Sequence, residues 1–272
     1  MTGGICVERF DHNKRIEADA AFLNEDFEAA FWGYFEGAVD FGDARSAFNL
    51  AFMYHQGYHT PRNYVWARKY YHLASYYYGG EAKFNLALMH MRGQGGDTDH
   101  RAAFDLMKAS AAEGCVHAQM YLGVAYTLGC IFDPVETECI SLIPFPRIIK
   151  REANVLLLTG NHQDPALEDQ RFEIIEANGN DAVEMFRLAA EQKDDTYIEQ
   201  EVGQAKFEMG RAIAEGLGSE YAPQKGFKLM ETAALTYDCK DALRYLHKNA
   251  PTAKVYGINT RRIALLLEEA EE

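Results

Sequence analysis

The stretch SAFNLAFMY at Ser46–Tyr54 decides the fold, because it recurs along the chain. Similar segments read AKFNLALMH at Ala82–His90 and AQMYLGVAY at Ala118–Tyr126, so the repeat period is 36 residues. A fourth copy, AKFEMGRAI, occupies Ala205–Ile213. A glycine follows eleven residues after each start, at Gly57, Gly93, Gly129 and Gly216. A fixed period of this length indicates a solenoid of stacked repeat units.

Each unit has a second repeated element. Ala67, Ala103 and Gly226 each lie 21 residues after the start of a first element, at Ser46, Ala82 and Ala205. In the third unit, Ala182 begins the corresponding second element. Apolar residues in both elements recur at helical spacing, so each unit is predicted to be a pair of α-helices. Small residues in the first helices would let neighbouring helix axes approach closely; they are Ala51, Ala87, Gly123 and Gly210.

The helix ends can also be predicted. The four glycines can adopt the left-handed conformation that ends a helix. Asn63 and Asp99 stand where the second helices need an N-cap. Asp181 and Glu184 resemble a capping box, and Thr260 is expected to cap a last helix.

These residues carry a family resemblance. The order A-x-F/Y-N-L-G/A-x-M-Y, then a glycine loop and a second helix ending in Ala-Ala-x-x-Gly, resembles the Sel1-like repeat, a relative of the tetratricopeptide repeat. The resemblance covers roughly 42–129 and 181–247, with the third unit interrupted and His59 in place of a loop glycine. It implies an all-α fold, a right-handed α/α solenoid of Sel1-like helix pairs with a helical insertion, in which the first helices line a concave face.

We expect one continuous solenoid domain with five parts. Residues 1–41 would form an N-terminal cap or degenerate half-repeat, and residues 42–129 the first two repeats and the first helix of the third. Residues 130–180 would be the insertion, 181–247 the rest of repeat three, repeat four and the start of repeat five, and 248–272 a C-terminal capping helix.

Composition narrows the class of protein. The 272 residues include 41 acidic and 27 basic side chains, a formal net charge of −14, with 48% hydrophobic residues as in globular proteins. This balance argues against nucleic-acid partners, which need clustered Lys and Arg, and suits a basic protein partner. No apolar stretch approaches the ~20 residues of a membrane span, so no membrane insertion is expected. Five cysteines without a C-x-x-C pair, and no signal-peptide pattern, predict a cytoplasmic protein with reduced thiols.

Motifs that would indicate catalysis are absent from the sequence. It contains no G-x-G-x-x-G, G-x-x-x-x-G-K-[ST], H-E-x-x-H or G-x-S-x-G. The glycines of Gly93–Gly96 belong to a repeat loop, and Asp97 beside them would repel phosphate. Five histidines lie at different repeat offsets, so they do not form a ladder of metal ligands. We therefore expect no enzymatic activity, no cofactor and no metal.

A candidate partner surface lies on the first helices, on the face opposite the predicted core stripe. Its residues are Phe52, His55, Gln56, Leu88, Met91, Arg92, Val124, Leu128, Arg211 and Glu215. Several are apolar where a solvated face would be polar, and an apolar patch with a polar rim is typical of a protein-binding site. The alternative is that these side chains pack beneath neighbouring units.

The insertion is a second candidate. Pro146 can open a helix, and Ile149, Ala153 and Leu156 behind it lie at helical spacing. A second short helix is expected over 168–177. Long insertions in compact arrays are often functional, so we expect partner contacts from Phe145, Arg147, Ile148 and Arg151. The alternative is that the insertion covers an exposed edge of the core.

Two functions follow. The first is a non-catalytic scaffold or adaptor that binds a protein or peptide on the concave face and the insertion. The second is an acidic inhibitor or immunity-type protein that neutralises a basic toxin or enzyme, because a net charge of −14 would speed association with a cationic target.

Overall fold

The computed structural model describes residues 12–77, 79–132, 171–174, 178–192, 199–218 and 220–271. The chain divides into two compact units. Unit 1 comprises Met1–Ser110 and Thr137–Lys150, and unit 2 comprises Ala111–Glu136 and Arg151–Glu272. Each unit is described by itself.

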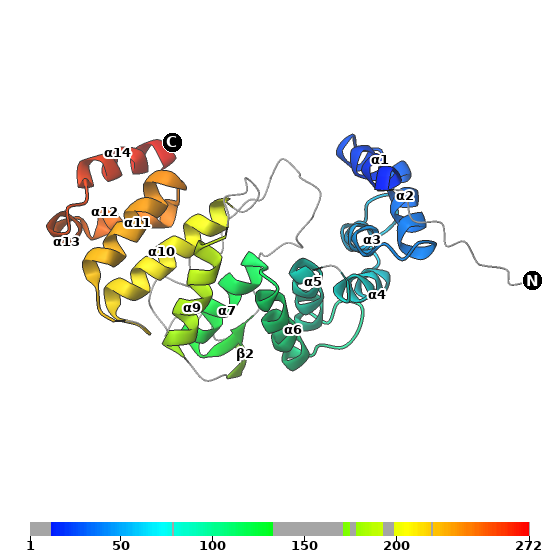
Figure 1. Ribbon diagram of the computed structural model, residues 1–272, viewed down its shortest axis with the longest axis horizontal. Helices are drawn as coiled ribbons and strands as arrows, with labels where there is room; N and C mark the ends of the chain where they lie inside the picture. Colours follow the sequence, from blue (N-terminus) through cyan, green and yellow to red (C-terminus); the bar gives the residue numbers. More distant parts are fainter. Residues whose placement is uncertain are drawn as a thin grey trace, which may run out of the picture. The chain divides into compact units, whose positions relative to one another are not determined.

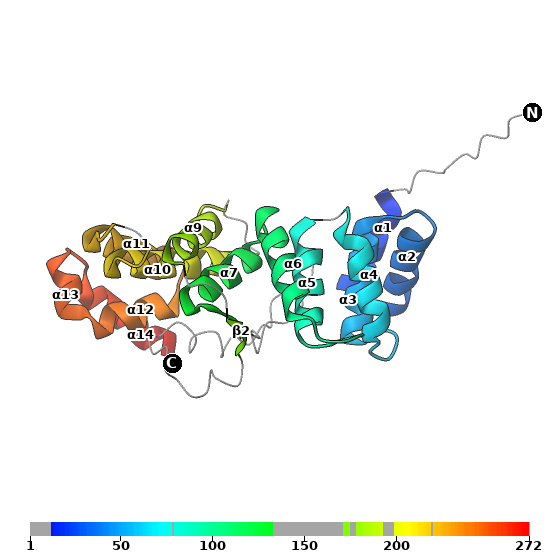
Figure 2. The same cartoon turned by 90° about the horizontal axis from the view of Figure 1, so that it is seen from below.

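Unit 1 is built from consecutive helices. They are α1 (His12–Leu23), α2 (Phe27–Val39), α3 (Ala44–Gln56), α4 (Tyr64–Ser75), α5 (Gly79–Met91) and α6 (His100–Ala112), whose last two residues belong to unit 2. From α1 to α5, each helix packs against the next one in the chain (Figures 1 and 2). The Ser110 hydroxyl of α6 donates a 2.6 Å hydrogen bond to the Gly80 carbonyl of α5.

Unit 2 continues the pattern. Its helices are α7 (Val116–Leu128), α9 (Gly179–Ala190), α10 (Glu199–Glu215), α11 (Pro223–Thr236), α12 (Lys240–Lys248), α13 (Ala250–Val255) and α14 (Thr260–Glu271). The helix α7 packs against α9, α9 against α10, and α10 against α11. The predicted all-α fold of helix pairs, an α/α solenoid, is confirmed.

One predicted helix is wrong. Residues Arg171–Ile174, inside the helix expected over 168–177, form the strand β2, which pairs antiparallel with β1 (Cys130–Phe132). The segment alternates polar Arg and Glu with apolar Phe and Ile, a period of two that suits a strand. The predicted helix behind Pro146 lies outside the described residues.

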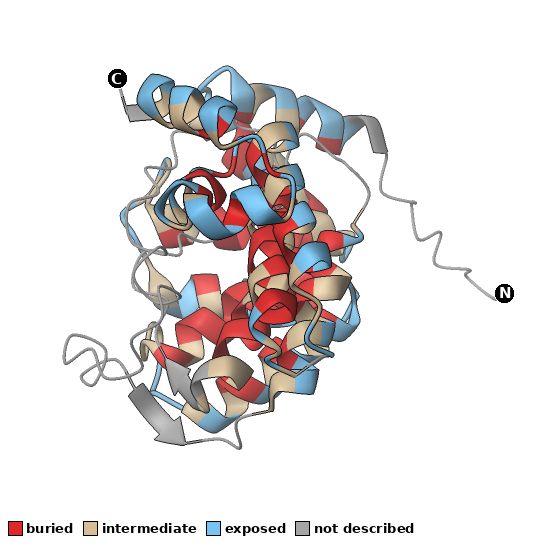
Figure 3. Ribbon diagram, turned by 90° about the vertical axis from the view of Figure 1, so that its left-hand side faces the viewer, coloured by how far each residue is buried: buried red, intermediate tan, exposed pale blue. Residues whose placement is uncertain are grey.

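The small residues of the helix pairs act as predicted. Ala51 and Ala87 are fully buried. A Cβ atom at Gly123 of α7 would lie 2.5 Å from the Phe186 ring of α9, and one at Gly210 would lie 2.7 Å from the Gly226 carbonyl oxygen. Figure 3 shows buried positions on the helix sides that face neighbouring helices. The absence of a side chain therefore sets how closely these helices pack.

Most predicted helix ends are confirmed. Gly57, Gly93, Gly129 and Gly216 all have left-handed backbone, with φ between 62° and 85°. The Asn63 side chain accepts from the Trp66 N–H at 3.2 Å, and that of Asp99 accepts from the Ala102 N–H at 2.8 Å.

Two predicted caps are displaced. Asn178 caps α9, accepting from the Asn180 N–H at 3.0 Å and donating to Asp181 at 2.9 Å, so this helix begins earlier than the capping box of Asp181 and Glu184 implied. Asn259, the residue before Thr260, accepts from the Arg262 N–H at 3.2 Å. In both cases an Asn amide upstream supplies the side-chain acceptor that the exposed N–H groups need.

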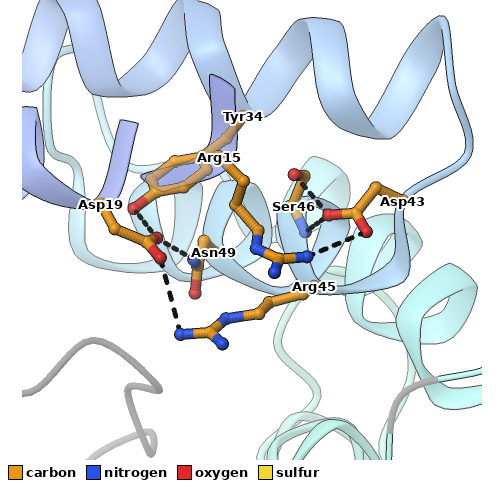
Figure 4. A network of polar contacts seen from close by, with 7 residues as sticks. All are labelled: Arg15, Asp19, Tyr34, Asp43, Arg45, Ser46 and Asn49. Atoms are coloured by element: carbon orange, nitrogen blue, oxygen red, sulfur yellow. Dashed lines mark hydrogen bonds and ion pairs between the residues drawn. The ribbon is translucent and has the colours of Figure 1, made fainter. Parts of the chain in front are cut away.

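The part of the chain before the first repeat contains two helices, α1 and α2, that pack against each other. The helix α1 is held on α2 and α3 by a polar network (Figure 4). Asp19 of α1 accepts from the Tyr34 hydroxyl at 2.8 Å and from the Asn49 amide at 3.2 Å. Arg45 and Arg15 add ion pairs to Asp19 and Asp43, at 3.5 and 3.4 Å.

Candidate protein-interaction surface

The first helices do not expose the apolar face that the sequence predicted. Phe52, His55, Leu88, Met91 and Val124 are all buried, with at most 8% of their surface exposed. For Phe52 the cause is α1, because the Phe22 ring of α1 lies 6.3 Å from the Phe52 ring between centroids. The expected exposure is therefore wrong for these five residues, and the alternative of packing beneath neighbouring helices holds for them.

The other predicted contact residues divide into two groups. Gln56, Arg92 and Arg211 are half-buried, and Glu215 is exposed. The Leu128 side chain and the insertion residues lie outside the described part of the chain; these insertion residues are Phe145, Arg147, Ile148 and Arg151.

His55 is part of the interior of unit 1. Its ring meets the rings of Tyr64 and Tyr71 at centroid distances of 5.2 and 6.2 Å. Burial, reinforced by the charges of Arg62 and Arg92, lowers the pKa of His55 to about 4. At neutral pH the imidazole is therefore uncharged and packs as an aromatic ring.

Arg211 belongs to a buried polar cluster of unit 2. Its guanidinium lies 3.1 Å from an oxygen of Glu208, a carboxylate of α10 that is 1% exposed. Burial raises the pKa of Glu208 to about 7, against the opposing effect of Arg211. On the next turn Glu215 accepts from the Tyr245 hydroxyl of α12 at 3.3 Å. The Glu215–Tyr245 hydrogen bond joins α10 to α12, and the Arg211 side chain is only 12% exposed, which leaves little of it for a partner.

A cysteine, a histidine and a carboxylate meet between α7 and α10. His117 Nε2 lies 3.3 Å from Glu201, which is 4% exposed. Burial alone would lower the pKa of His117, but hydrogen bonds with Cys115 and Glu201 outweigh it and raise the pKa to about 9. Such a grouping could activate a thiol nucleophile. The Cys115 side chain is only 2% exposed, so a substrate could not reach it and the contact is one of packing.

Unit 1 carries a group of exposed and half-buried aromatic side chains that the sequence analysis did not select. We call it the aromatic surface; it consists of Trp32 and Phe35 of α2, Tyr54 of α3, His59 of the following loop, and Trp66 and Tyr70 of α4. It contains both tryptophans of the chain, which are 55% and 43% exposed. Tryptophan is usually well buried, so two exposed indoles in one group indicate a binding surface.

Ring contacts join these side chains into two groups, and the buried Phe31 ring connects the groups, at centroid distances of 5.4 Å from the Trp32 ring and 5.3 Å from the Tyr54 ring. The Tyr54 and Tyr70 rings stack at 5.9 Å, and the Trp66 ring stacks on the Tyr70 ring at the same centroid distance. On α2 the Trp32 ring meets Phe35 at 5.7 Å and His59 at 6.4 Å. Mutual contact fixes the rings in place, so a partner would meet a rigid apolar surface at little cost in entropy.

His59 occupies a position that usually requires glycine. Gly95 and Gly218 stand at the same offset of their units and have φ values of 77° and 64°, and His59 has a φ of 63°. A left-handed conformation costs a residue with a side chain about 1–2 kcal/mol. In return the imidazole lies 5.0 Å from the Phe31 ring and completes the aromatic surface.

Comparison of the repeat offsets could have found this surface. Val65 and Trp66 stand where the second unit has Arg101 and Ala102 and the fourth has Gln224 and Lys225. A large apolar pair at offsets that are otherwise polar or small is not explained by the packing common to the units.

Two other kinds of site are absent from the described residues. They contain no helix long and apolar enough to cross a membrane. Within the same ranges, no group of three or more His, Cys, Asp or Glu side chains is placed to hold a metal ion.

Comparisons with known proteins agree with the repeat pattern. The Sel1 repeat family model matches residues 44–76, 80–115, 172–194 and 203–235. No curated protein matches the sequence significantly.

Two solved structures align with the chain. The crystal structure of a Sel1 repeat protein from Oxalobacter formigenes aligns with a TM-score of 0.64 and 16% identity, over 94% of this chain and 84% of that one. The structure of c5321, a protective antigen of uropathogenic Escherichia coli strains with an SLR fold, aligns with a TM-score of 0.44 and 17% identity, over 85% of this chain and 47% of that one. At 16% identity the first similarity shows the fold alone.

Proposed function

Because the chain is built of Sel1 repeats, we propose that it is a non-catalytic scaffold that binds a protein partner. The observation that carries the proposal is the aromatic surface of unit 1, where both tryptophans of the chain are exposed. Trp and Tyr are the side chains that most often dominate the energy of protein interfaces. The second helices α2 and α4 supply most of this surface, so the proposed docking site differs from the concave face expected from the family.

Site-specific photo-crosslinking tests this proposal. A photoreactive amino acid at Val65, which is 52% exposed beside Trp66, should capture a partner in cells. The same amino acid at Val255, which is 79% exposed in unit 2, is the control. We expect a defined adduct from position 65 that is lost when Trp32 and Trp66 are both changed to Ala, because truncating central aromatic anchors weakens binding at least about tenfold. The same adduct from both positions, or one that survives the double substitution, would contradict the proposal.

The insertion belongs to the same proposal as a second contact region. Changing Phe145 and Arg147 together to Ala should weaken partner binding without lowering the thermal midpoint of the protein. A lowered midpoint with unchanged affinity per folded molecule would mean that the insertion covers the core instead.

A different function, an acidic inhibitor of a basic toxin or enzyme, is favoured by the formal charge of −14. It requires a single tight complex whose association depends on long-range attraction. The dependence of the association rate on salt distinguishes such an inhibitor from a scaffold.

A further inference from the structure

We propose that the α2 half of the aromatic surface binds an arginine side chain of the partner, held between the Trp32 indole and the carboxylate of Glu28. This inference rests on the proposed function and specifies the chemistry of the segment that docks there. The occupant is a peptide segment of the partner that presents an arginine side chain to this face of α2.

Two acidic side chains and an indole lie on one face of α2. Glu28, Trp32 and Glu36 are spaced at i, i+4 and i+8, so they share one face of the helix with the indole in the middle. Trp32 is 55% exposed and Glu28 is exposed. Glu36 already pairs with Lys14 of α1. Glu28 has no cationic partner among the described residues, which leaves its carboxylate for a ligand.

The same surface already makes a contact with a cation. On α4, the Lys69 ammonium lies 4.6 Å from the centroid of the Trp66 ring. A cation near a tryptophan ring is attracted by the electrons of its face. Over Trp32, by contrast, no cation lies in the described part of the chain. The two indoles of one surface therefore differ, with a cation at Trp66 and none at Trp32.

Arginine suits the pair of Trp32 and Glu28 better than lysine does. A guanidinium is planar, so it can stack on an indole while donating two parallel hydrogen bonds to a carboxylate. Glu28, one helical turn before Trp32, is placed for the second contact. A lysine ammonium can make the ring contact but cannot make the paired hydrogen bonds, so we expect it to bind more weakly.

His59 supports this interpretation independently. Its ring lies 6.4 Å from the Trp32 ring, although its backbone has a φ that favours glycine. Replacing His59 by Gly should relieve the backbone and leave thermal stability equal or higher. If the ring serves the binding of a ligand at Trp32, the same change should weaken that binding.

The experiment uses the two indole N–H signals of the ¹⁵N-labelled full chain. Because the chain has two tryptophans, the variants Trp32→Phe and Trp66→Phe assign both signals. The probe is a Gly/Ser peptide with two arginines; matched peptides carry lysine or citrulline, which is neutral but has nearly the same shape as arginine. Glu28→Gln is compared with Glu269→Gln, which makes the same change of charge at an exposed residue of unit 2.

We expect the arginine peptide to shift the Trp32 signal saturably, with the citrulline peptide at least about tenfold weaker and the lysine peptide between them. Glu28→Gln should weaken binding about fivefold or more, and Glu269→Gln should leave it nearly unchanged. Equal binding of citrulline would overturn the inference in favour of an apolar occupant. Equal effects of the two Glu→Gln changes would overturn it in favour of diffuse attraction to an acidic protein.

Three further outcomes are decisive. If sedimentation shows a dimer that Trp32→Leu dissociates, the occupant is a second copy of this chain and the inference is wrong. If the arginine peptide fails to bind while the crosslink from position 65 still requires Trp32, the scaffold proposal stands and the arginine inference falls. If the peptide binds as expected but no crosslink forms, the scaffold proposal fails on its own.

Discussion

His55 shows how a single residue can change role between sequence and structure. In the sequence it lies on the predicted outer face of a first helix, where a histidine suits a partner site. In the structure its ring packs against Tyr64 and Tyr71, and burial lowers its pKa to about 4. The unfolded chain, where histidine titrates near 6.5, therefore binds a proton more readily than the folded chain does.

This difference predicts a dependence of stability on pH. As pH falls from about 6.5 to about 4, the unfolded state takes up a proton that folded His55 does not, so the free energy of unfolding decreases, by at most about 3 kcal/mol. Urea titrations across this range measure it. The variant His55→Gln removes the titrating group, and its free energy of unfolding should fall less steeply than that of the wild type. Parallel curves for the two proteins would show that His55 is not buried as a neutral ring.

At this scale, local chemistry could be predicted and long-range burial could not. Gly57 and Asn63 act through their own backbone and the next helical turn, so their roles are visible in the sequence. Phe52 is covered by Phe22, which is thirty residues away in a helix that the sequence analysis did not identify. Trp32 and Trp66 are the opposite case: they are exposed, and nothing in the neighbouring sequence shows that a tryptophan stays exposed.

At the scale of elements, helix pairs follow from the 36-residue period because each unit repeats the same packing. The helix α1 and the strand β2 have no counterpart at that period, and both were missed. The helix α1 is placed by polar contacts such as that of Asp19 with Tyr34, which depend on residues far apart in the sequence. The alternating pattern of β2 covers only four residues, which is too short to be recognised as a strand within the helix expected over 168–177.

Close packing of α7 and α9 can be tested at one position. Gly123→Ala would normally stabilise a helix by about 0.5–1 kcal/mol. Here the new Cβ would lie 2.5 Å from the Phe186 ring, so we expect a net loss of about 1–3 kcal/mol in the free energy of unfolding. Phe186→Leu in the same chain should recover part of the loss, since it makes room for the methyl group. Additive effects of the two substitutions would show that the helices are not in contact there.

At the scale of the whole molecule, the net charge and the aromatic surface affect different stages of partner binding. The formal charge of −14 acts over distance, but salt screens it, with a Debye length of about 10 Å at 0.1 M. Contacts with Trp32 and Trp66 act only after docking, where they slow dissociation. A scaffold that relies on the aromatic surface and an inhibitor that relies on charge should therefore differ in which rate constant responds to salt.

We expect the aromatic surface to dominate binding of the native partner. The Kd of the complex should rise less than about tenfold between about 0.05 and 0.5 M NaCl, and this rise should come from a slower association rate. Trp32→Leu should raise the dissociation rate about tenfold or more at every salt concentration, while Leu265→Ala, at a residue that is 60% exposed in unit 2, should not. Surface plasmon resonance measures both rates. An association rate that falls about a hundredfold with salt, together with no effect of Trp32→Leu, would instead identify the acidic protein as an inhibitor of a basic target, because only long-range attraction would then be sustaining the complex.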